Sequence, residues 1–347
     1  MKTLIVGGNF GESLEKRESG VIKKIYNELL GPGQEVDLIN GGKLTDLPDK
    51  IDGYDFILWM PNIDNSEGKT YPQKDPGSVL VCSKVMRPGY SKADAISRIF
   101  KMHGNAVIEI WKYENSELIK FVLFDALGNQ WYSGNSIVEL VKELLKFYIF
   151  TKSAIRIKTT QIKEESEVTL GLCKLINLNK KLQEYIMTSC GDRFFGNLST
   201  RCTKLFPSMR KDVETMYVSP RNVPKDSIRP EDMVLYTSND EYLGDHKPSV
   251  DSPTQIRLYQ ELPNINFMIH GHAILEKAQT TKNYRLCGDI REVSEVLEIV
   301  QPSNLWFVIN LRNHGFLVGT TDLEDLETII NNIKNGKYGE IKITNQK

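Results

Sequence analysis

The sequence lacks the features that mark membrane-spanning and nucleic-acid-binding proteins. No apolar run approaches the ~20 residues that a membrane-spanning helix needs. The first apolar run, Lys2–Val6, is also too short for a signal-peptide core and is typical of a β-strand. The formal net charge is only −1 over 347 residues, so no overall basic field attracts nucleic acid or anionic lipid. We therefore expect a cytoplasmic protein that binds neither nucleic acid nor membranes.

Cysteine is scarce, and its pattern excludes the common cysteine-based sites. Five cysteines occur without CxxC spacing, at Cys82, Cys173, Cys190, Cys202 and Cys287. The odd number and the wide spacing favour reduced, buried thiols over a disulfide framework or a cysteine zinc site. With 40% hydrophobic and 26% charged residues, the composition is that of a globular protein. The length predicts two domains.

The first half of the chain, residues 1–152, alternates strand and helix patterns. The short apolar strands predict a parallel sheet covered on both faces, with about five core strands. We interpret this half as a doubly wound α/β domain of Rossmann-like or flavodoxin-like type. The expected strands are Lys2–Val6, Glu35–Ile39, Tyr54–Met60, Ser78–Cys82, Ala106–Trp111 and Phe121–Phe124, and the expected helices are Ser19–Leu30, Ala93–Met102 and Ser136–Thr151.

A glycine-rich turn follows the first expected strand. Gly8, Asn9 and Gly11 lie where doubly wound folds bind phosphates or nucleotides against a helix N-terminus. The segment is neither GxGxxG nor a P-loop, because it lacks the lysine and the hydroxyl residue of the latter. We expect these three residues to bind a cofactor, and the alternative is that the glycines only allow a tight turn.

The second half, residues 153–347, begins within a charged stretch that runs from Lys152 to Glu167 and separates the halves. Its pattern predicts a mixed α/β domain with antiparallel strands. The expected helices are Val168–Cys190, Pro253–Leu262, Ile290–Ile299 and Asp322–Lys334, and the expected strands are Phe194–Cys202, Met216–Ser219, Met233–Thr237, Asn266–His272, Trp306–Leu311 and Phe316–Gly319.

Histidine occurs only five times, yet two histidines are separated by a single residue within one expected strand. Side chains at i and i+2 of a strand point to the same face, so His270 and His272 are expected to project together. His314 lies where a later strand ends in a turn. Three histidines leave a fourth position on zinc for water or substrate, which is the pattern of a catalytic site. The alternative is a pair of hydrogen-bonded histidines that bind nothing.

Four sequence blocks in order, between Arg193 and Ile329, resemble the class II aldolase/adducin family. The first two are Phe195–Ser199 and Lys247–Thr254, the latter followed by Leu258 and Tyr259. The third is the two-histidine strand Phe267–Ala273, and the fourth is the turn Leu311–Gly319. The family includes fuculose-phosphate and rhamnulose-phosphate aldolases and ribulose-phosphate 4-epimerase.

The resemblance implies a divalent metal, zinc, held by His270, His272 and His314. It implies that Asp251 completes the metal shell or moves a proton. The aldolases usually carry glutamate there, and the 4-epimerase carries aspartate. The implied activity is that of a lyase (aldolase) or epimerase. Its substrate would be a small hydroxy-carbonyl compound, a sugar phosphate or related anion, that reacts through a metal-stabilised enediolate. Such relatives place the site between subunits, often in tetramers, so a homo-oligomer is expected.

The resemblance also assigns residues to the anionic end of the substrate. These residues are Gly196, Asn197, Ser199, Ser219, Ser249 and Arg221. The chain departs from the family here, because relatives commonly have a Thr/Ser-x-Ser-Gly turn where this chain has Ser219-Pro220-Arg221-Asn222. Arg221 could replace the lost donors with a guanidinium that suits phosphate or carboxylate, or it is a surface residue. Gln255 stands where several relatives have histidine.

Three alternatives stay open at this point. Asp251 or Ser252 could merely cap the helix that starts at Pro253. The second half could be an assembly module like the adducin head, which lacks the metal ligands. The chain could also be a nucleotide-handling enzyme whose chemistry resides in the first half.

Overall fold

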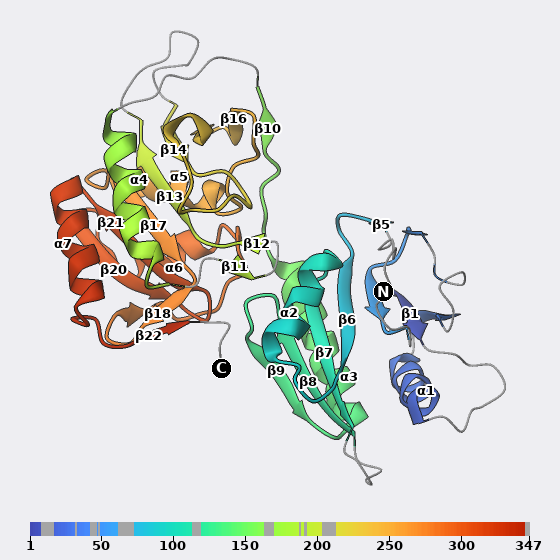
Figure 1. The fold of residues 1–347 in the computed structure, drawn as a ribbon. Coiled ribbons are helices and arrows are strands. Elements are labelled where there is room, and N and C mark those ends of the chain that lie inside the picture. The colour runs from blue at the N-terminus through green and yellow to red at the C-terminus, as the bar shows by residue number, and fades with distance from the viewer. Residues whose placement is uncertain are drawn as a thin grey trace. The chain divides into compact units, whose positions relative to one another are not determined.

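A computed structural model of the chain describes residues 1–7, 17–31, 33–41, 47, 49–61, 73–112, 119–162, 170–186, 189–190, 193–202 and 213–343. The chain forms two compact units, Met1–Ser153 and Ala154–Asn345. Each unit has its own sheet and its own helices (Figure 1). No helix among the described residues is long and apolar enough to span a bilayer.

The N-terminal unit is a doubly wound α/β domain. Its seven-stranded sheet has the order β2-β1-β4-β6-β7-β8-β9 over the described residues, and the first five of these strands are parallel. Numbered among themselves, the parallel strands run 2-1-3-4-5, the flavodoxin-like order. The strands are β1 (Lys2–Gly7), β2 (Glu35–Asn40), β4 (Phe56–Trp59), β6 (Val79–Met86), β7 (Ala106–Lys112), β8 (Ile119–Asp125) and β9 (Gln130–Gly134), with a separate pair of β3 (Lys50–Ile51) and β5 (Gln73–Lys74).

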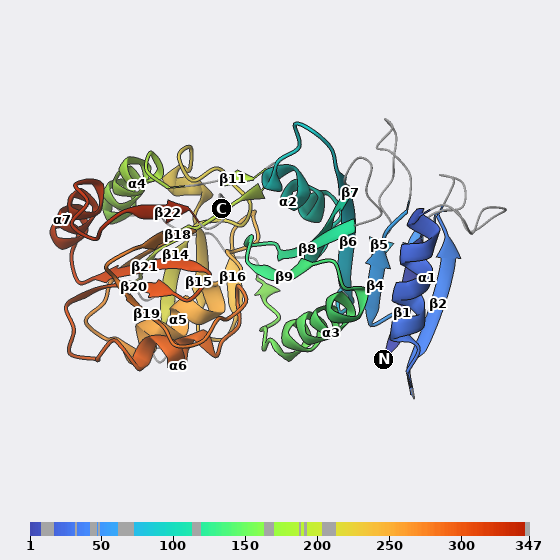
Figure 2. The ribbon, with the colours of Figure 1, turned by 90° about the horizontal axis from the view of Figure 1, so that it is seen from below.

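Helices cover both faces of this sheet, as the sequence predicts. Helices α1 (Arg17–Leu29) and α3 (Ile137–Ser153) bury apolar side chains against one face, and α2 (Lys92–Lys101) covers the other. Figure 2 shows α2 and α3 on opposite sides of the strands. Ser91 begins α2 with a capping box, in which Ser91 and Asp94 bond each other's backbone N–H.

Two antiparallel strands extend the five-stranded parallel part of the sheet at one edge. Strands β8 and β9 run antiparallel to their neighbours. Only six residues separate β7 from β8, and a parallel connection needs a crossover of a dozen or more. Between β8 and β9, the Asp125 carboxylate accepts the backbone N–H groups of Leu127 and Asn129. This carboxylate therefore stabilises a tight hairpin turn.

The C-terminal unit is built on a mixed, mainly antiparallel sheet. Among the described residues, its nine strands have the order β10-β16-β15-β14-β13-β17-β21-β20-β19. The bounds are β10 (Thr160–Gln161), β13 (Asn197–Arg201), β14 (Thr215–Val218), β15 (Val234–Thr237), β16 (Glu241–Leu243), β17 (Phe267–Gly271), β19 (Gln279–Thr280), β20 (Trp306–Leu311) and β21 (Gly315–Thr320). Two further pairs join β11 (Ser189–Cys190) to β12 (Arg193–Phe194) and β18 (Ala273–Leu275) to β22 (Ile341–Ile343).

Helices pack on both faces of this second sheet as well. One face is covered by α4 (Leu170–Gln183) and α7 (Leu323–Lys334), and the other by α5 (Ser252–Glu261) and α6 (Glu292–Leu297). The expected single helix Val168–Cys190 is wrong, because α4 ends at Gln183 and Ser189–Cys190 pairs as a strand. The buried Ile186 between them approaches Gly271, so this segment packs beside the histidine strand.

Candidate metal centre

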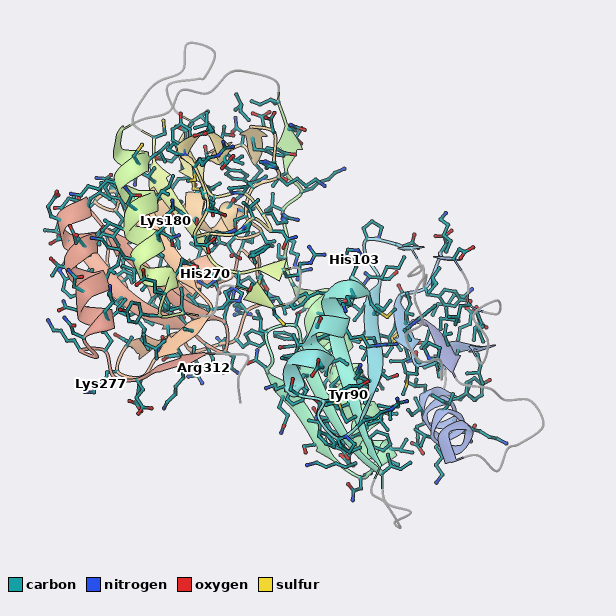
Figure 3. The ribbon with its side chains drawn as sticks, in the orientation of Figure 1. Tyr90, His103, Lys180, His270, Lys277 and Arg312 are labelled. Atoms are coloured by element: carbon teal, nitrogen blue, oxygen red, sulfur yellow. The ribbon has the colours of Figure 1, made fainter. Side chains whose placement is uncertain are left out.

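His270 lies on β17, near the middle of the second sheet (Figure 3). It faces Asn197 of β13 on one side and Leu317 of β21 on the other. Its Nδ1 lies 2.8 Å from the carbonyl oxygen of Phe316. Since a carbonyl oxygen can only accept, Nδ1 donates this bond and Nε2 keeps its lone pair. Nε2 is buried and has no hydrogen-bond partner among the described residues.

His272 and His314 reach the same place from different elements. His272 lies between β17 and β18, one residue beyond the end of β17, although the sequence predicts that the strand includes it. Its ring stacks on Phe195 with centroids 4.9 Å apart. His314 ends the turn between β20 and β21, in which Asn313 adopts a positive φ of 55°. Asparagine tolerates this left-handed conformation, so a short loop can aim His314 inward.

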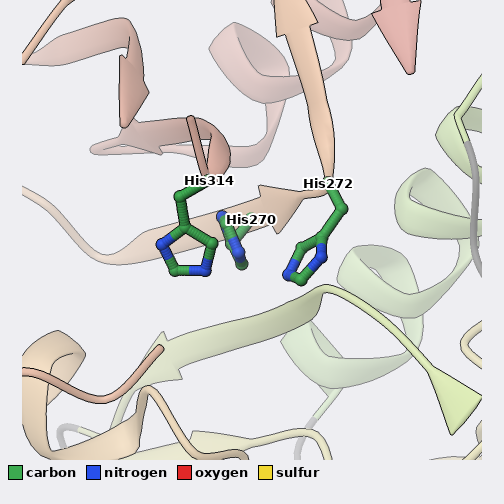
Figure 4. A group of neighbouring side chains, drawn as sticks. All are labelled: His270, His272 and His314. Atoms are coloured by element: carbon green, nitrogen blue, oxygen red, sulfur yellow. The ribbon is translucent and has the colours of Figure 1, made fainter. Parts of the chain in front are cut away.

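The three imidazoles form one buried cluster (Figure 4). Their ring centroids are 4.7–5.2 Å apart, and one ligand nitrogen from each lies within 4.8 Å of the others. The exposed fractions of the three residues are 2%, 4% and 0%. Buried imidazole nitrogens that converge without satisfying one another are suited to a divalent ion. The residues present therefore fit a zinc-type metal.

Burial also sets the charge of two of these rings. Burial and, to a lesser degree, the neighbouring His314 lower the pKa of His270 to about 4, with Asp251 opposing the shift. Burial likewise lowers the pKa of His272 well below its ordinary value. Both rings are therefore neutral at physiological pH, which is the form that binds metals.

His314 has two polar partners that the sequence reasoning did not assign to the site. Its Nδ1 lies 3.1 Å from Oε1 of Glu292, and its Nε2 lies 3.2 Å from Sγ of Cys287. Burial disfavours a charged His314, but these two partners outweigh it and raise the His314 pKa. Burial also raises the pKa of Glu292. One signal could have revealed Glu292: it precedes the core residue Val296 by one helical turn, so it shares the buried face of α6.

Asp251 lies beside the histidines, but its side chain does not cap α5. Asp251 occupies the N-cap position without a side-chain capping bond. One carboxylate oxygen accepts from the Asn197 side chain at 3.0 Å, and the other accepts from the backbone N–H of Gly288 at 2.9 Å. The capping interpretation of this side chain is therefore wrong. Its oxygens lie within 4.8 Å of ligand atoms of Cys287 and His314.

The side chains of Asn197 and Gln255 orient the Asp251 carboxylate. The Gln255 side-chain amide donates to Oδ1 of Asn197, which leaves the Asn197 amide to donate to Asp251. Both residues are 2% exposed. Gln255, which stands where several relatives have histidine, therefore fixes the direction of the Asn197 amide.

The three serines predicted for anion binding are buried and bonded within the protein. The Ser199 hydroxyl lies 3.0 Å from the Tyr259 hydroxyl. Ser219 Oγ accepts from the Leu198 backbone N–H, and Ser249 Oγ accepts from the Asp251 backbone N–H. The structure thus brings Ser219 and Ser249 to the strand and loop that carry Asn197 and Asp251.

Gly196 lies where only a glycine fits next to the histidine strand. Gly196 has a φ of +73°, and a Cβ there would lie 2.6 Å from the backbone oxygen of His270. Glycine is required so that β13 can pass next to the histidine strand.

Arg221 is exposed, and its Nε donates to the Pro248 carbonyl oxygen at 3.3 Å. Although the residue as a whole is exposed, partial burial of the guanidinium lowers its pKa. The charge of Asp251 opposes this shift, so the guanidinium lies within electrostatic range of the site.

The predicted cofactor residues Gly8, Asn9 and Gly11 lie outside the described residues. They follow the carboxyl end of β1, which ends at Gly7. Their role stays a prediction.

A comparison with protein families identifies the central part of the second unit. Residues 173–292 match the family described as Class II Aldolase and Adducin N-terminal domain. This match confirms the resemblance that the sequence blocks indicate. It includes Asn197, Asp251, His270 and His272, whereas His314 lies beyond its end. No curated protein matches the chain.

Several solved structures are similar in part to this chain. An L-fuculose 1-phosphate aldolase is 20% identical, with 49% of this chain and 85% of that chain covered and a TM-score of 0.37. YgbL from Escherichia coli, a putative aldolase/epimerase/decarboxylase, is 16% identical, with 47% and 84% covered and a TM-score of 0.37. The DNA/pantothenate metabolism flavoprotein from Streptococcus pneumoniae is 11% identical, with 42% and 97% covered and a TM-score of 0.30. The family assignment therefore rests on the sequence match.

Proposed function

Because residues 173–292 match the family described as Class II Aldolase and Adducin N-terminal domain, we propose that this chain is a metal-dependent lyase or epimerase. Its substrate would be a small hydroxy-carbonyl compound with an anionic group, such as a sugar phosphate. The observation that carries the proposal is the convergence of three buried histidine nitrogens next to a hydrogen-bonded carboxylate. The adducin-like alternative, a domain without metal ligands, does not account for this arrangement.

The chemistry of the site follows from its donors. His270, His272 and His314 would hold the ion, and imidazole ligands suit zinc. A bound zinc ion supplies a Lewis acid, which stabilises negative charge on an oxygen next to the reacting carbon.

Asp251 is the group that would hold or move a proton at the substrate carbon. Its two hydrogen bonds, from Asn197 and Gly288, fix the carboxylate in one direction. A fixed base needs no reorientation before the reaction. Gln255 and Asn197 therefore act as positioning residues for Asp251.

Arg221 would bind the anionic end of the substrate. It is exposed, and the buried hydroxyls of Ser199, Ser219 and Ser249 already have partners within the protein. A guanidinium can pair with phosphate or carboxylate through two hydrogen bonds. We retain the prediction that several copies associate, up to a tetramer, as part of this proposal.

An activity screen tests the proposal. The zinc-loaded protein would be incubated with ketose phosphates, and aldehyde release and epimer formation would be followed by NMR. We expect Asp251→Asn to bind zinc and to lose activity at least about 100-fold, because a proton-transfer group typically contributes that much. Arg257→Lys, whose side chain pairs with Asp240 away from the histidines, serves as the control. Equal activity of Asp251→Asn and the unmodified protein would contradict the role of Asp251.

A further inference from the structure

We propose that the Cys287 thiolate is a fourth protein ligand of the metal held by His270, His272 and His314. This inference rests on the metal centre of the proposed function, and it assigns to that centre a sulfur donor. It makes the site of this chain one of mixed nitrogen and sulfur ligands.

The distance between the donor atoms fits a shared ion. Sγ of Cys287 lies 3.2 Å from Nε2 of His314. Two ligands on one tetrahedral zinc, at Zn–S near 2.3 Å and Zn–N near 2.0 Å, are roughly 3.5 Å apart. The Cys287 and His314 atoms are therefore already spaced almost as one edge of a tetrahedron. His314 links two groups of potential ligands, because one of its ligand atoms lies within 4.8 Å of those of His270 and His272 and one lies within 4.8 Å of those of Asp251 and Cys287.

The backbone around Cys287 is fixed against the Asp251 segment. The N–H of Gly288 donates to the Asp251 carboxylate at 2.9 Å. Gly288 has a φ of +74°, and a Cβ there would lie 2.7 Å from the Val250 carbonyl oxygen. Only glycine allows this close approach without strain. The approach holds the preceding residue, Cys287, beside His314.

Asp251 is less suited than Cys287 to be the fourth ligand. Each carboxylate oxygen of Asp251 already accepts a hydrogen bond from the protein. The Sγ atom of Cys287 instead faces His314, whose second nitrogen is bonded to Glu292. One proton lies between Sγ and Nε2, on either atom. An ion that replaces this proton joins both atoms and releases one proton to solvent.

A sulfur ligand changes which metals the site prefers. Thiolate favours zinc and cobalt, whereas Mn²⁺ and Mg²⁺ prefer oxygen ligands. We therefore expect Cys287→Ser to weaken zinc binding about 10–100-fold and to change Mn²⁺ binding much less.

Cobalt substitution tests the proposal by spectroscopy. The full-length protein would be stripped with a chelator, loaded with one equivalent of Co²⁺ and examined by absorption. We expect a sulfur-to-cobalt charge-transfer band in the near ultraviolet, together with the visible bands of four-coordinate cobalt. The near-ultraviolet band should disappear in Cys287→Ser and persist in Cys202→Ser, a matched control in the same unit.

The outcomes separate this inference from the function on which it rests. Stoichiometric Co²⁺ binding without the near-ultraviolet band, or a band that survives Cys287→Ser, would overturn the cysteine ligand and leave the histidine centre standing. Failure of the folded protein to bind Co²⁺ at all would overturn both. Loss of all cobalt bands in His270→Ala, with the band of Cys202→Ser intact, supports both.

Discussion

At the scale of single residues, the site depends on partners that orient each ligand. His270 is oriented by the Phe316 carbonyl oxygen, His314 by Glu292, and Asp251 by Asn197 and Gly288. Each of these hydrogen bonds fixes one histidine tautomer or one carboxylate orientation before a metal ion binds. The sequence blocks identify the histidines and the aspartate. They do not identify Glu292 or Cys287, because both reach the site from a segment whose position depends on tertiary packing.

Glu292 provides a test of this orientation. We expect Glu292→Ala to weaken zinc binding about 10–100-fold, because the His314 ring then loses the acceptor that fixes its Nδ1 hydrogen. Competition with a chromophoric chelator measures the change. Glu298→Ala, on an exposed residue that follows α6, is the matched control and should bind zinc normally. Normal zinc affinity in Glu292→Ala would show that His314 needs no such support.

Lys225 gives the protein a predictable pH dependence. It is 2% exposed, its Nζ donates to the carbonyl oxygens of Pro220 and Val223, and burial lowers its pKa from 10.5 to about 8. Between about pH 8 and pH 10.5 the unfolded chain keeps a proton that the folded chain has lost. The free energy of unfolding therefore rises with pH across this range, by up to about 3 kcal/mol.

Urea unfolding at several pH values measures this effect. Between about pH 8 and pH 10.5, the free energy of unfolding of the unmodified protein should rise relative to that of Lys225→Met, because methionine fills a similar space without a titrating group. A difference that stays constant from pH 7.5 to pH 10 would show that the Lys225 pKa is not lowered.

At the scale of the elements, strands β17 and β21 approach each other closely around the histidines. A Cβ at Gly315 would lie 2.1 Å from the Gly271 carbonyl oxygen and 3.1 Å from Cε1 of His270. Because the Gly271 backbone cannot shift without disturbing its strand, β17 and β21 would have to move apart. The strand pattern predicts both strands, but the need for glycine comes from packing between residues far apart in the sequence.

Gly315→Ala tests how tightly these strands hold the site. We expect it to destabilise the C-terminal unit by more than about 2 kcal/mol and to weaken zinc binding, since the His270 ring is displaced. Thermal unfolding followed by circular dichroism gives the stability. Gly20→Ala, in α1 where a Cβ meets no atom within 4 Å, should instead leave stability unchanged or raise it by about 0.5–1 kcal/mol. An equally stable Gly315→Ala would contradict the close packing.

At the scale of the whole molecule, the sequence predicts the fold class of each unit better than the strands at the edge of its sheet and the ends of its helices. Alternating strands and helices predict the doubly wound sheet, and the observed strand order confirms that fold class. The antiparallel β8 and β9 depend on a short connection and on the Asp125 turn, which periodicity does not reveal. The end of α4 at Gln183 is missed for a related reason, because Ile186 packs against the histidine strand instead of continuing the helix.

The metal content of the purified full-length protein tests the central claim most directly. We predict one divalent ion per chain by plasma mass spectrometry after reconstitution with zinc and removal of excess metal. His270→Ala should bind no such ion while keeping its circular dichroism spectrum. A folded, unmodified protein without a stoichiometric ion, or an unchanged ion content in folded His270→Ala, would contradict a metal centre at His270, His272 and His314.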